Sequence, residues 1–247
     1  MSTTSSATDA LAERGTLPEG PAKAAMVRAM FDTIASRYDL VNRLMTFGLD
    51  VRWRRVAVRA LGLPRGSRVV DVACGTGDFC RLLADAGIEA LGVDLSLGML
   101  RAGRHRTPCV QADALALPLR AGAVDGATCG FALRNVTDLA ALLAELARVV
   151  RPGGRIALLE VHQPASPVLR AGHALWFRRG VPLIGALLSD AAAYRYLPQS
   201  VAYLPAPERL RAMVHDAGFR TVGRRTFGAG AAQLLTATRA GHPSGAS

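Results

Sequence analysis

A short glycine-rich segment contains the first residues whose types and spacing could bind a ligand. Residues 70–78 read Val-Asp-Val-Ala-Cys-Gly-Thr-Gly-Asp, so only Thr76 separates Gly75 from Gly77. Glycines let a backbone approach a ligand closely. A loop after the first strand of a parallel sheet also lies at the edge where such folds bind ligands. The spacing differs from the Gly-x-Gly-x-x-Gly of dinucleotide-binding folds, and the Gly-Lys-Ser/Thr of a phosphate-binding loop is missing.

Two acidic residues follow this segment at the spacing of successive strand ends. Asp94 ends the apolar run 90–94, and Asp113 ends the run 110–113. A carboxylate at the end of the second strand is placed to accept hydrogen bonds from both ribose hydroxyls of an adenosine, and Asp113 would then meet the adenine amino group. Alone, Asp94 is more simply a helix cap. Together with the glycine-rich segment, the two acids predict a nucleoside pocket.

The segments that must position these residues alternate between strand and helix patterns. Short apolar runs predict strands at 68–73, 90–94, 110–113, 124–131 and 155–161, with helices at 79–86, 96–104 and 139–150 between them. This alternation is typical of an α/β fold with a doubly wound, Rossmann-like parallel sheet. N-terminal helices are predicted over 24–61 with a break at Gly48. After the fifth strand we expect a helical insertion near 164–205, then a helix at 207–217 and two closing strands at 220–227 and 232–238.

One domain is expected to span residues 23–240, with disordered tails at 1–22 and 241–247. The longest later apolar run, 181–188, is far shorter than the ~20 residues that span a bilayer, and no signal peptide pattern is apparent. The four cysteines are spaced neither as a disulfide framework nor as a metal site. The sequence therefore predicts a cytoplasmic protein without a metal.

Basic residues outnumber acidic ones, 30 to 19, which gives a formal net charge of +11 and a pI near 10.8. Such a balance indicates an anionic partner, namely nucleic acid, a membrane surface or an acidic metabolite. Coding bias is the alternative explanation, because Lys23 is the only lysine while Ala, Arg, Gly and Pro abound. The arginines are scattered rather than gathered in a stripe, so we do not expect a nucleic-acid partner.

Several motifs, taken in order, resemble one enzyme family. Segments 71–78, 93–96 and 111–114 resemble motifs I, II and III of class I S-adenosylmethionine-dependent methyltransferases. The match is closer to the C-methyltransferases of menaquinone and ubiquinone biosynthesis, as in demethylmenaquinone methyltransferases. It covers 24–238 through Phe-Asp-x-Ile-Ala-x-Arg-Tyr-Asp-x-x-Asn at 31–42, Gly-x-x-x-x-Trp-Arg-Arg at 48–55, and the segments 131–138, 148–160 and 194–200. Departures from the family pattern fall at Asp50, Gly130, Ala132, Val161, His162 and Leu234 or Leu235. They concern the expected acceptor pocket and leave the enzyme class unchanged.

The resemblance implies S-adenosylmethionine as the methyl donor. Its binding residues would be Asp71, Gly75, Thr76, Gly77, Asp94, Asp113, Ala114 and Gly130. The implied acceptor is a lipophilic, prenylated quinol of demethylmenaquinol type, methylated at a ring carbon. The alternative is another aromatic or secondary-metabolite acceptor.

Methylation of a ring carbon needs an electron-rich acceptor, so a group that stabilises the phenolate of the quinol should dominate catalysis. We expect Arg134 to be that group and Asn135 to orient the quinol oxygen. Tyr38 or His162 would relay the proton. A surface ion pair between Arg134 and Asp138 is the alternative role for the arginine.

Residues 169–203 leave two interpretations of how a lipophilic acceptor is reached. Trp176 and Phe177 beside Arg178 and Arg179, followed by the apolar run 181–188, suit a peripheral contact with a membrane surface. The same residues suit a lid packed over the acceptor pocket. The sequence also leaves a homodimer open.

Overall fold

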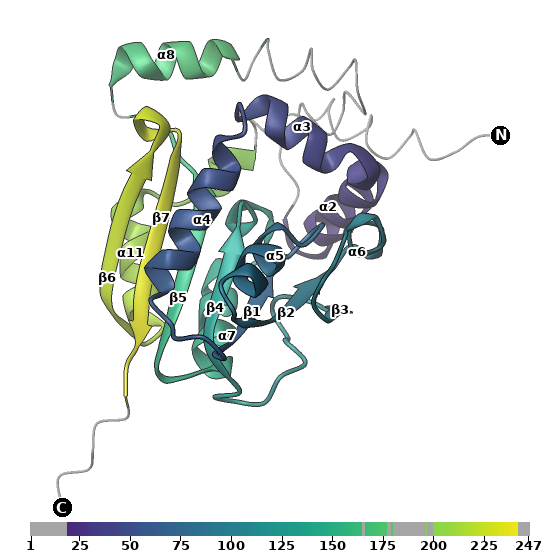
Figure 1. Cartoon of the computed structure of the whole chain (residues 1–247). Helices are drawn as coiled ribbons and strands as arrows, with labels where there is room; N and C mark the ends of the chain where they lie inside the picture. The colour runs from purple at the N-terminus through teal and green to yellow at the C-terminus, as the bar shows by residue number, and fades with distance from the viewer. Residues whose placement is uncertain (1–18, 165, 177–178, 180–195, 197–199, 242–247) are drawn as a thin grey trace, which may run out of the picture.

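The computed structural model describes residues 19–164, 166–176, 179, 196 and 200–241. A seven-stranded sheet in the order β3-β2-β1-β4-β5-β7-β6 lies at its centre (Figure 1). The strands are β1 (Arg68–Val72), β2 (Glu89–Asp94), β3 (Cys109–Gln111), β4 (Val124–Gly130), β5 (Val150–Val161), β6 (Phe219–Phe227) and β7 (Ala232–Arg239). Strands β1 to β5 run parallel, whereas β7 is antiparallel to both β5 and β6. The predicted doubly wound α/β fold is confirmed.

Helices cover both faces of the sheet. Within the described residues, three helices precede it, namely α2 (Gly20–Ile34), α3 (Tyr38–Met45) and α4 (Leu49–Leu61). The later helices described are α5 (Asp78–Asp85), α6 (Leu97–Ala102), α7 (Leu139–Val149), α8 (Pro167–Leu175) and α11 (Pro207–Asp216). Apolar side chains of α4 and α5 pack on one face of the sheet, and those of α7 and α11 pack on the other. Parallel strands buried on both faces read as continuous apolar runs, which is why these strands were predictable.

Two strand boundaries differ from the prediction by more than one residue. Strand β3 ends at Gln111, because Asp113 begins a turn in which its Oδ1 accepts a hydrogen bond from the amide of Leu115 at 2.9 Å. Strand β5 begins at Val150 rather than at 155, since Val150 is buried and pairs with Val124 across a register shift. Residues 151–154, which lie between the predicted helix 139–150 and the predicted strand 155–161, are therefore an irregular part of β5.

The N-terminal helices begin earlier than predicted, and α2 and α3 cover one edge of the sheet. Helix α2 begins at Gly20, inside the predicted tail, with Pro21 in its first turn, where proline is favoured. The predicted break at Gly48 is confirmed, since this residue has φ 73° and precedes α4. A separate apolar cluster joins α2 and α3 to Tyr196. These helices lie beyond the carboxyl ends of the parallel strands (Figure 1).

Part of the predicted insertion at 164–205 is described. It contains α8 and the short 3-10 helix η4 (Val201–Tyr203). Phe177, Arg178 and the run 181–188, like the terminal segments 1–18 and 242–247, lie outside the described residues. Among the described residues, no helix combines the length and the hydropathy needed to span a bilayer.

Candidate functional site

Two adjoining cavities lie at the carboxyl edge of the sheet, against α2 and α3. We call them the Asp94 cavity, of about 840 Å³, and the Arg134 cavity, of about 1290 Å³. Both are lined by Phe31, Tyr38 and Phe131, so they share a wall. Ligands held in the two cavities would therefore lie next to each other.

Asp94 lines the first cavity and is the last residue of β2. Its Oδ2 accepts a hydrogen bond from the amide of Gly75 at 2.7 Å, and its Oδ1 accepts one from the amide of Ser96 at 2.8 Å. Burial raises the pKa of the carboxyl group, and these two backbone amides act against that rise. Asp94 thus holds together the glycine loop and the start of α6. The capping role considered for Asp94 is taken by Ser96, whose Oγ accepts from the amide of Met99.

Five of the eight predicted cofactor residues line the Asp94 cavity, namely Gly75, Asp94, Asp113, Ala114 and Gly130. Gly75 has φ +56°, which favours glycine. A Cβ on Gly130 would lie 2.6 Å from the ring of Phe79, so only glycine lets β4 end in such close contact with α5. These five residues come from the ends of β1, β2 and β4 and from the turn after β3.

The other three predicted cofactor residues lie beside the Asp94 cavity rather than on it. Asp71 is buried between strands, where its Oδ1 accepts from the Thr128 hydroxyl at 2.7 Å, and burial raises its pKa well above the ordinary value. Asp71 and Thr76 line a small cavity of about 300 Å³ under the loop. Gly77 lines none of these cavities and precedes α5 with φ 87°. These three residues belong to β1 or to the glycine loop but do not line the Asp94 cavity.

Two residues that sequence reasoning missed have strained backbones at the cavity. Ala73 follows β1 with φ 53°, and Phe131 follows β4 with φ 59°. Both line the Asp94 cavity. Left-handed backbone is unfavourable for residues with a Cβ and tends to persist at functional sites. At each of these residues the chain turns sharply as it leaves the sheet beside the Asp94 cavity.

Helix α2 forms a wall of the Asp94 cavity that the sequence did not predict. Its residues Val27, Arg28 and Phe31 belong to the lining. Asp32 attaches the helix to α6, because its Oδ1 accepts from the Ser96 hydroxyl at 2.5 Å and from the amide of Gly98 at 2.8 Å. The aspartate that follows Phe31 in the N-terminal motif therefore has a docking role.

The Arg134 cavity is mostly apolar and contains a buried cation. Arg134 is only 5% exposed, and its Nη1 donates to Glu160 at 2.5 Å and to the carbonyl of Phe131 at 2.6 Å. Its Nε donates to the hydroxyl of Ser200 at 3.1 Å. Glu160, at the end of β5, is fully buried. Three segments far apart in the sequence therefore hold the guanidinium in one orientation.

The surface ion pair considered for Arg134 is wrong. Asp138 instead caps α7, with its Oδ1 accepting from the amide of Ala141 at 2.9 Å. The buried carboxylate of Glu160, 26 positions later in the chain, takes the role of ion-pair partner. Spacing along a helix predicts only local pairs, which is why the sequence pointed to Asp138.

Tyr38 lies at the shared wall, Asn135 lines the Asp94 cavity alone, and His162 lines neither cavity. Asn135 lines the Asp94 cavity, and its Oδ1 accepts from the hydroxyl of Tyr196 at 3.4 Å. Burial raises the pKa of Tyr38, so its phenol keeps its proton at neutral pH. His162 lines neither cavity and lies 2.9 Å from Nη2 of Arg224, and burial lowers its pKa. Of the two predicted proton relays, only Tyr38 is near the cavities.

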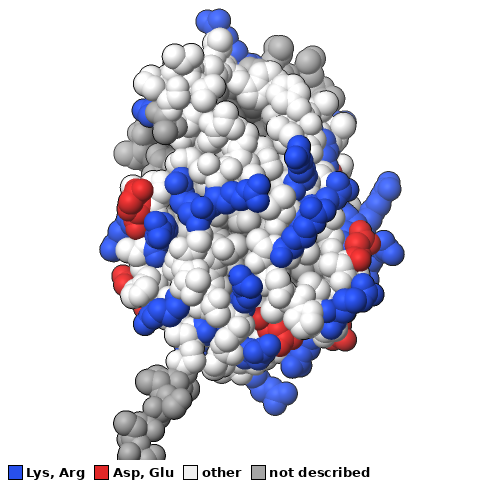
Figure 2. All heavy atoms as spheres, turned by 60° about the vertical axis from the view of Figure 1, so that its left-hand side comes forward, with Lys and Arg blue, Asp and Glu red and all other residues white. Residues whose placement is uncertain are grey.

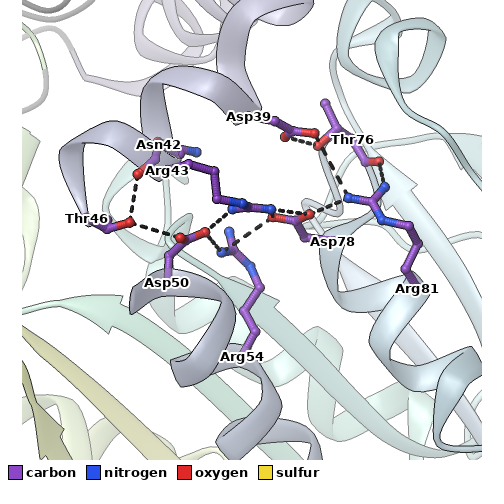
Figure 3. A network of polar contacts seen from close by, with 9 residues as sticks. All are labelled: Asp39, Asn42, Arg43, Thr46, Asp50, Arg54, Thr76, Asp78 and Arg81. Carbon is purple, nitrogen blue, oxygen red and sulfur yellow. Dashed lines mark hydrogen bonds and ion pairs between the residues drawn. The ribbon is translucent and has the colours of Figure 1, made fainter. Parts of the chain in front are cut away.

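A network of arginines and aspartates connects the N-terminal helices to the glycine loop (Figure 3). Arg43 of α3 donates to both carboxylate oxygens of Asp78, at 2.8 and 2.7 Å, and also pairs with Asp50. Arg54 of α4 lies 2.5 Å from Asp50 and 3.5 Å from Asp78. Burial acts to raise the pKa of Asp78, but the neighbouring arginines outweigh it and hold this pKa below the ordinary value. The network fixes α3 and α4 against α5.

Comparison with known proteins identifies the family of this chain. The sequence profile of the ubiE/COQ5 methyltransferase family matches residues 20–239. The chain belongs to this family. It is 45% identical to the demethylmenaquinone methyltransferase of Roseiflexus castenholzii, over 91% of this chain and 98% of that protein. It is 43% identical to the ubiquinone/menaquinone biosynthesis C-methyltransferase of Syntrophotalea carbinolica, over 86% of this chain and 93% of that protein.

A solved structure shows the same fold in a more distant protein. The phosphoethanolamine N-methyltransferase 2 of Haemonchus contortus, in complex with S-adenosyl-L-methionine, has a TM-score of 0.64 at 14% identity. The similarity covers 92% of this chain and 61% of that one. The sheet order and the strand-end loops described above are thus those of a methyltransferase fold, and the chain is a methyltransferase of the ubiE/COQ5 family.

Proposed function

We propose that this methyltransferase transfers the methyl group of S-adenosylmethionine to a ring carbon of a prenylated quinol of the demethylmenaquinol type. The observation that carries the proposal is the wall shared by the two cavities. Phe31, Tyr38 and Phe131 contact both volumes, so a donor in the Asp94 cavity lies against an acceptor in the Arg134 cavity. The names of the family's curated relatives support this acceptor class.

The Asp94 cavity fits the donor. A carboxylate oxygen accepts more than one hydrogen bond, so Asp94 can bind ribose hydroxyls while it keeps the amides of Gly75 and Ser96. Asp113 and Ala114, on the turn after β3, line the same cavity and would face the base. When bound, S-adenosylmethionine supplies an electrophilic methyl group, and the chain has to orient the acceptor and exclude water.

The Arg134 cavity fits an apolar ring with an ionisable oxygen. In the described part of the chain, the bonds of Arg134 use Nε and Nη1, and its Nη2 is left to donate to an acceptor oxygen. Glu160 and Ser200 hold the guanidinium in place, and such preorganised donors stabilise a developing phenolate without reorganisation. Tyr38 remains protonated and therefore acts as a hydrogen-bond donor to the acceptor rather than as its base.

The acceptor also determines where the enzyme works. A prenyl tail partitions into lipid with ~0.8 kcal/mol for each buried CH₂, so free acceptor in water is scarce. The enzyme therefore acts at a membrane surface as a peripheral protein, and its partner is the lipophilic quinol rather than nucleic acid.

A methyl-transfer assay tests the function. Purified protein, S-adenosylmethionine with a labelled methyl group and a short-chain demethylmenaquinol kept reduced should give a labelled quinol. Arg134→Lys keeps a charge but loses the planar fork, so it should bind the donor normally and lose most of the turnover. Turnover within about threefold of the wild type, ~0.6 kcal/mol on the transition-state scale, would make Arg134 structural. Labelling of another phenol but not of the quinol would refute the acceptor class.

A further inference from the structure

The exposed large apolar side chains gather on two segments of the molecule. Among the described residues they are Leu40, Leu44, Phe47 and Leu49 around the α3–α4 turn, and Val168, Leu169 and Leu175 on α8. Phe47 is 74% exposed and Val168 is 81% exposed. Single exposed apolar residues are ordinary, but a group of them marks an interaction site. We call this set the apolar collar.

The two segments of the collar are joined. The ring of Phe47 stacks on Trp176, directly after α8, with centroids 5.1 Å apart. The indole Nε1 of Trp176 donates to the carbonyl of Met45 at 3.2 Å. Both segments lie at the end of the molecule beyond the carboxyl edge of the sheet (Figure 1). Trp176 thus packs against the α3–α4 turn, whereas the large apolar residues of α8 remain exposed to solvent.

The collar adjoins the Arg134 cavity. Two collar residues, Phe47 and Leu49, belong to the lining of that cavity, and so do their neighbours Met45 and Trp176. The other collar residues lie on α3 and α8. An apolar tail that extends out of the cavity would meet these side chains instead of water. A cavity with an apolar rim fits an acceptor that is only partly withdrawn from lipid.

The described parts of the collar segments are predominantly basic. Arg170 and Arg179 lie on or just after α8, and residues 161–189 contain no Asp or Glu. On the other segment, Asp39 accepts a hydrogen bond from the Thr76 hydroxyl and lies 4.0 Å from Arg81. Asp50, next to the other segment, is 1% exposed and is neutralised by its arginine partners. The acidic side chains visible in Figure 2 lie lower on the molecule, away from this end. A surface of apolar residues with arginines complements anionic lipid headgroups.

We propose that the apolar collar docks on an anionic lipid bilayer, so that a prenylated acceptor passes from the bilayer into the Arg134 cavity without crossing water. This inference rests on the proposed function, because it assigns the tail of the acceptor to the collar. The proposed partner of the collar is a membrane, and the alternative partner is a second copy of the chain.

Vesicle binding by the full-length protein tests the proposal. The double variant Leu44→Gln and Val168→Gln removes two exposed apolar side chains, neither of which lines the Arg134 cavity. Wild type should bind vesicles of phosphatidylcholine with phosphatidylglycerol, bind pure phosphatidylcholine less, and be released by high salt. The double variant should bind the mixed vesicles at least tenfold more weakly. Arg209→Ser, an exposed site on α11, is the matched control and should bind like the wild type.

The outcomes separate the inference from the proposed function. Turnover of a short-chain quinol in solution should be unchanged in the double variant, because that acceptor needs no bilayer. If the double variant binds vesicles like the wild type, or wild type ignores lipid charge, the docking proposal is overturned while the methyl-transfer function stands. A dimer in sedimentation that the double variant dissociates would also overturn it, since a second copy would then cover the collar.

Discussion

The Asp94 cavity and the Arg134 cavity meet at Tyr38, but their walls come from differently spaced parts of the chain. The first is built mainly from consecutive strand ends, at 73–75, 93–96, 112–115 and 130–132, with α2 added as a wall. The second combines α2, α3, α4, the end of β5, Trp176 and residues near 201 and 230. A donor site made of strand-end loops follows from the sheet topology. An acceptor site made of distant segments requires the whole fold.

The polar groups of the two cavities are also held by contacts of different range along the chain. Asp94 is held by backbone amides of neighbouring loops, which any sequence with the same turns would supply. Arg134 is held by the side chains of Glu160 and Ser200 and by the carbonyl of Phe131. We therefore expect substitutions at Arg134 to affect both folding and turnover, whereas substitutions at Asp94 should affect mainly the binding of the donor.

The largest expected effect is the loss of the buried ion pair. Arg134→Met leaves the carboxylate of Glu160 without its cation in a fully buried site, and breaking such a pair costs roughly 3–5 kcal/mol of stability. Denaturant unfolding should show this loss. Adding Glu160→Gln should restore part of it, because the uncompensated charge is removed. Asp138→Ala is the control and should cost only ~1 kcal/mol, the value of a helix cap. Equal losses of stability for Arg134→Met and Asp138→Ala would contradict the view that Arg134 is held by a buried ion pair.

Removal of the Asp94 carboxylate should give the next largest effect. Its hydrogen bonds to the ribose hydroxyls are worth ~1.5–3 kcal/mol each before water compensates, so Asp94→Ala should weaken donor binding in calorimetry at least tenfold. Asp113→Ala is the matched control on the exposed side of the cavity and should cost less. Unchanged affinity in Asp94→Ala would show that the nucleoside lies elsewhere.

The sequence predicted the fold and the donor half better than the acceptor half. All seven strands overlap their predicted ranges, and the central strands β1 and β4 are largely buried, which leaves a clear apolar pattern. Gly75, Asp94 and Gly130 line the Asp94 cavity, since each ends a parallel strand or follows one. Asp71 lies within β1 and is directed toward Thr128, and its predicted role in binding the cofactor stays a prediction.

The acceptor half could not be derived from local pattern. Arg134 and Glu160 pair across 26 positions, and Arg43 and Asp78 across 35. No helix or strand periodicity relates such residues, so only the folded chain shows them together. The resemblance of 31–42 to a family motif was the available signal for the N-terminal docking residues. It marked Asp32 and Asp39 without saying that they bind Ser96 and Thr76.

The smallest expected effect concerns Lys23, which connects the surroundings of the two cavities. Its Nζ donates to the carbonyl of Val136 at 2.7 Å and lies 3.5 Å above the ring of Tyr203. Burial lowers the pKa of Lys23 to about 8, although Glu19 acts to raise it. Between pH 8 and the ordinary lysine pKa of 10.5, the unfolded chain therefore binds more protons at this site than the folded chain does.

The contribution of Lys23 to stability should therefore rise with pH across that window. Lys23→Met lacks the titration, while the tyrosines and cysteines that ionise in the same range are common to both proteins. Denaturant unfolding at pH 7 and at about pH 10 should show the wild type gaining stability relative to Lys23→Met as the pH rises. A constant difference between the two proteins would mean that the amine keeps its ordinary pKa. In that case, α2 would be held to the loop after β4 by a solvated charge rather than a buried one.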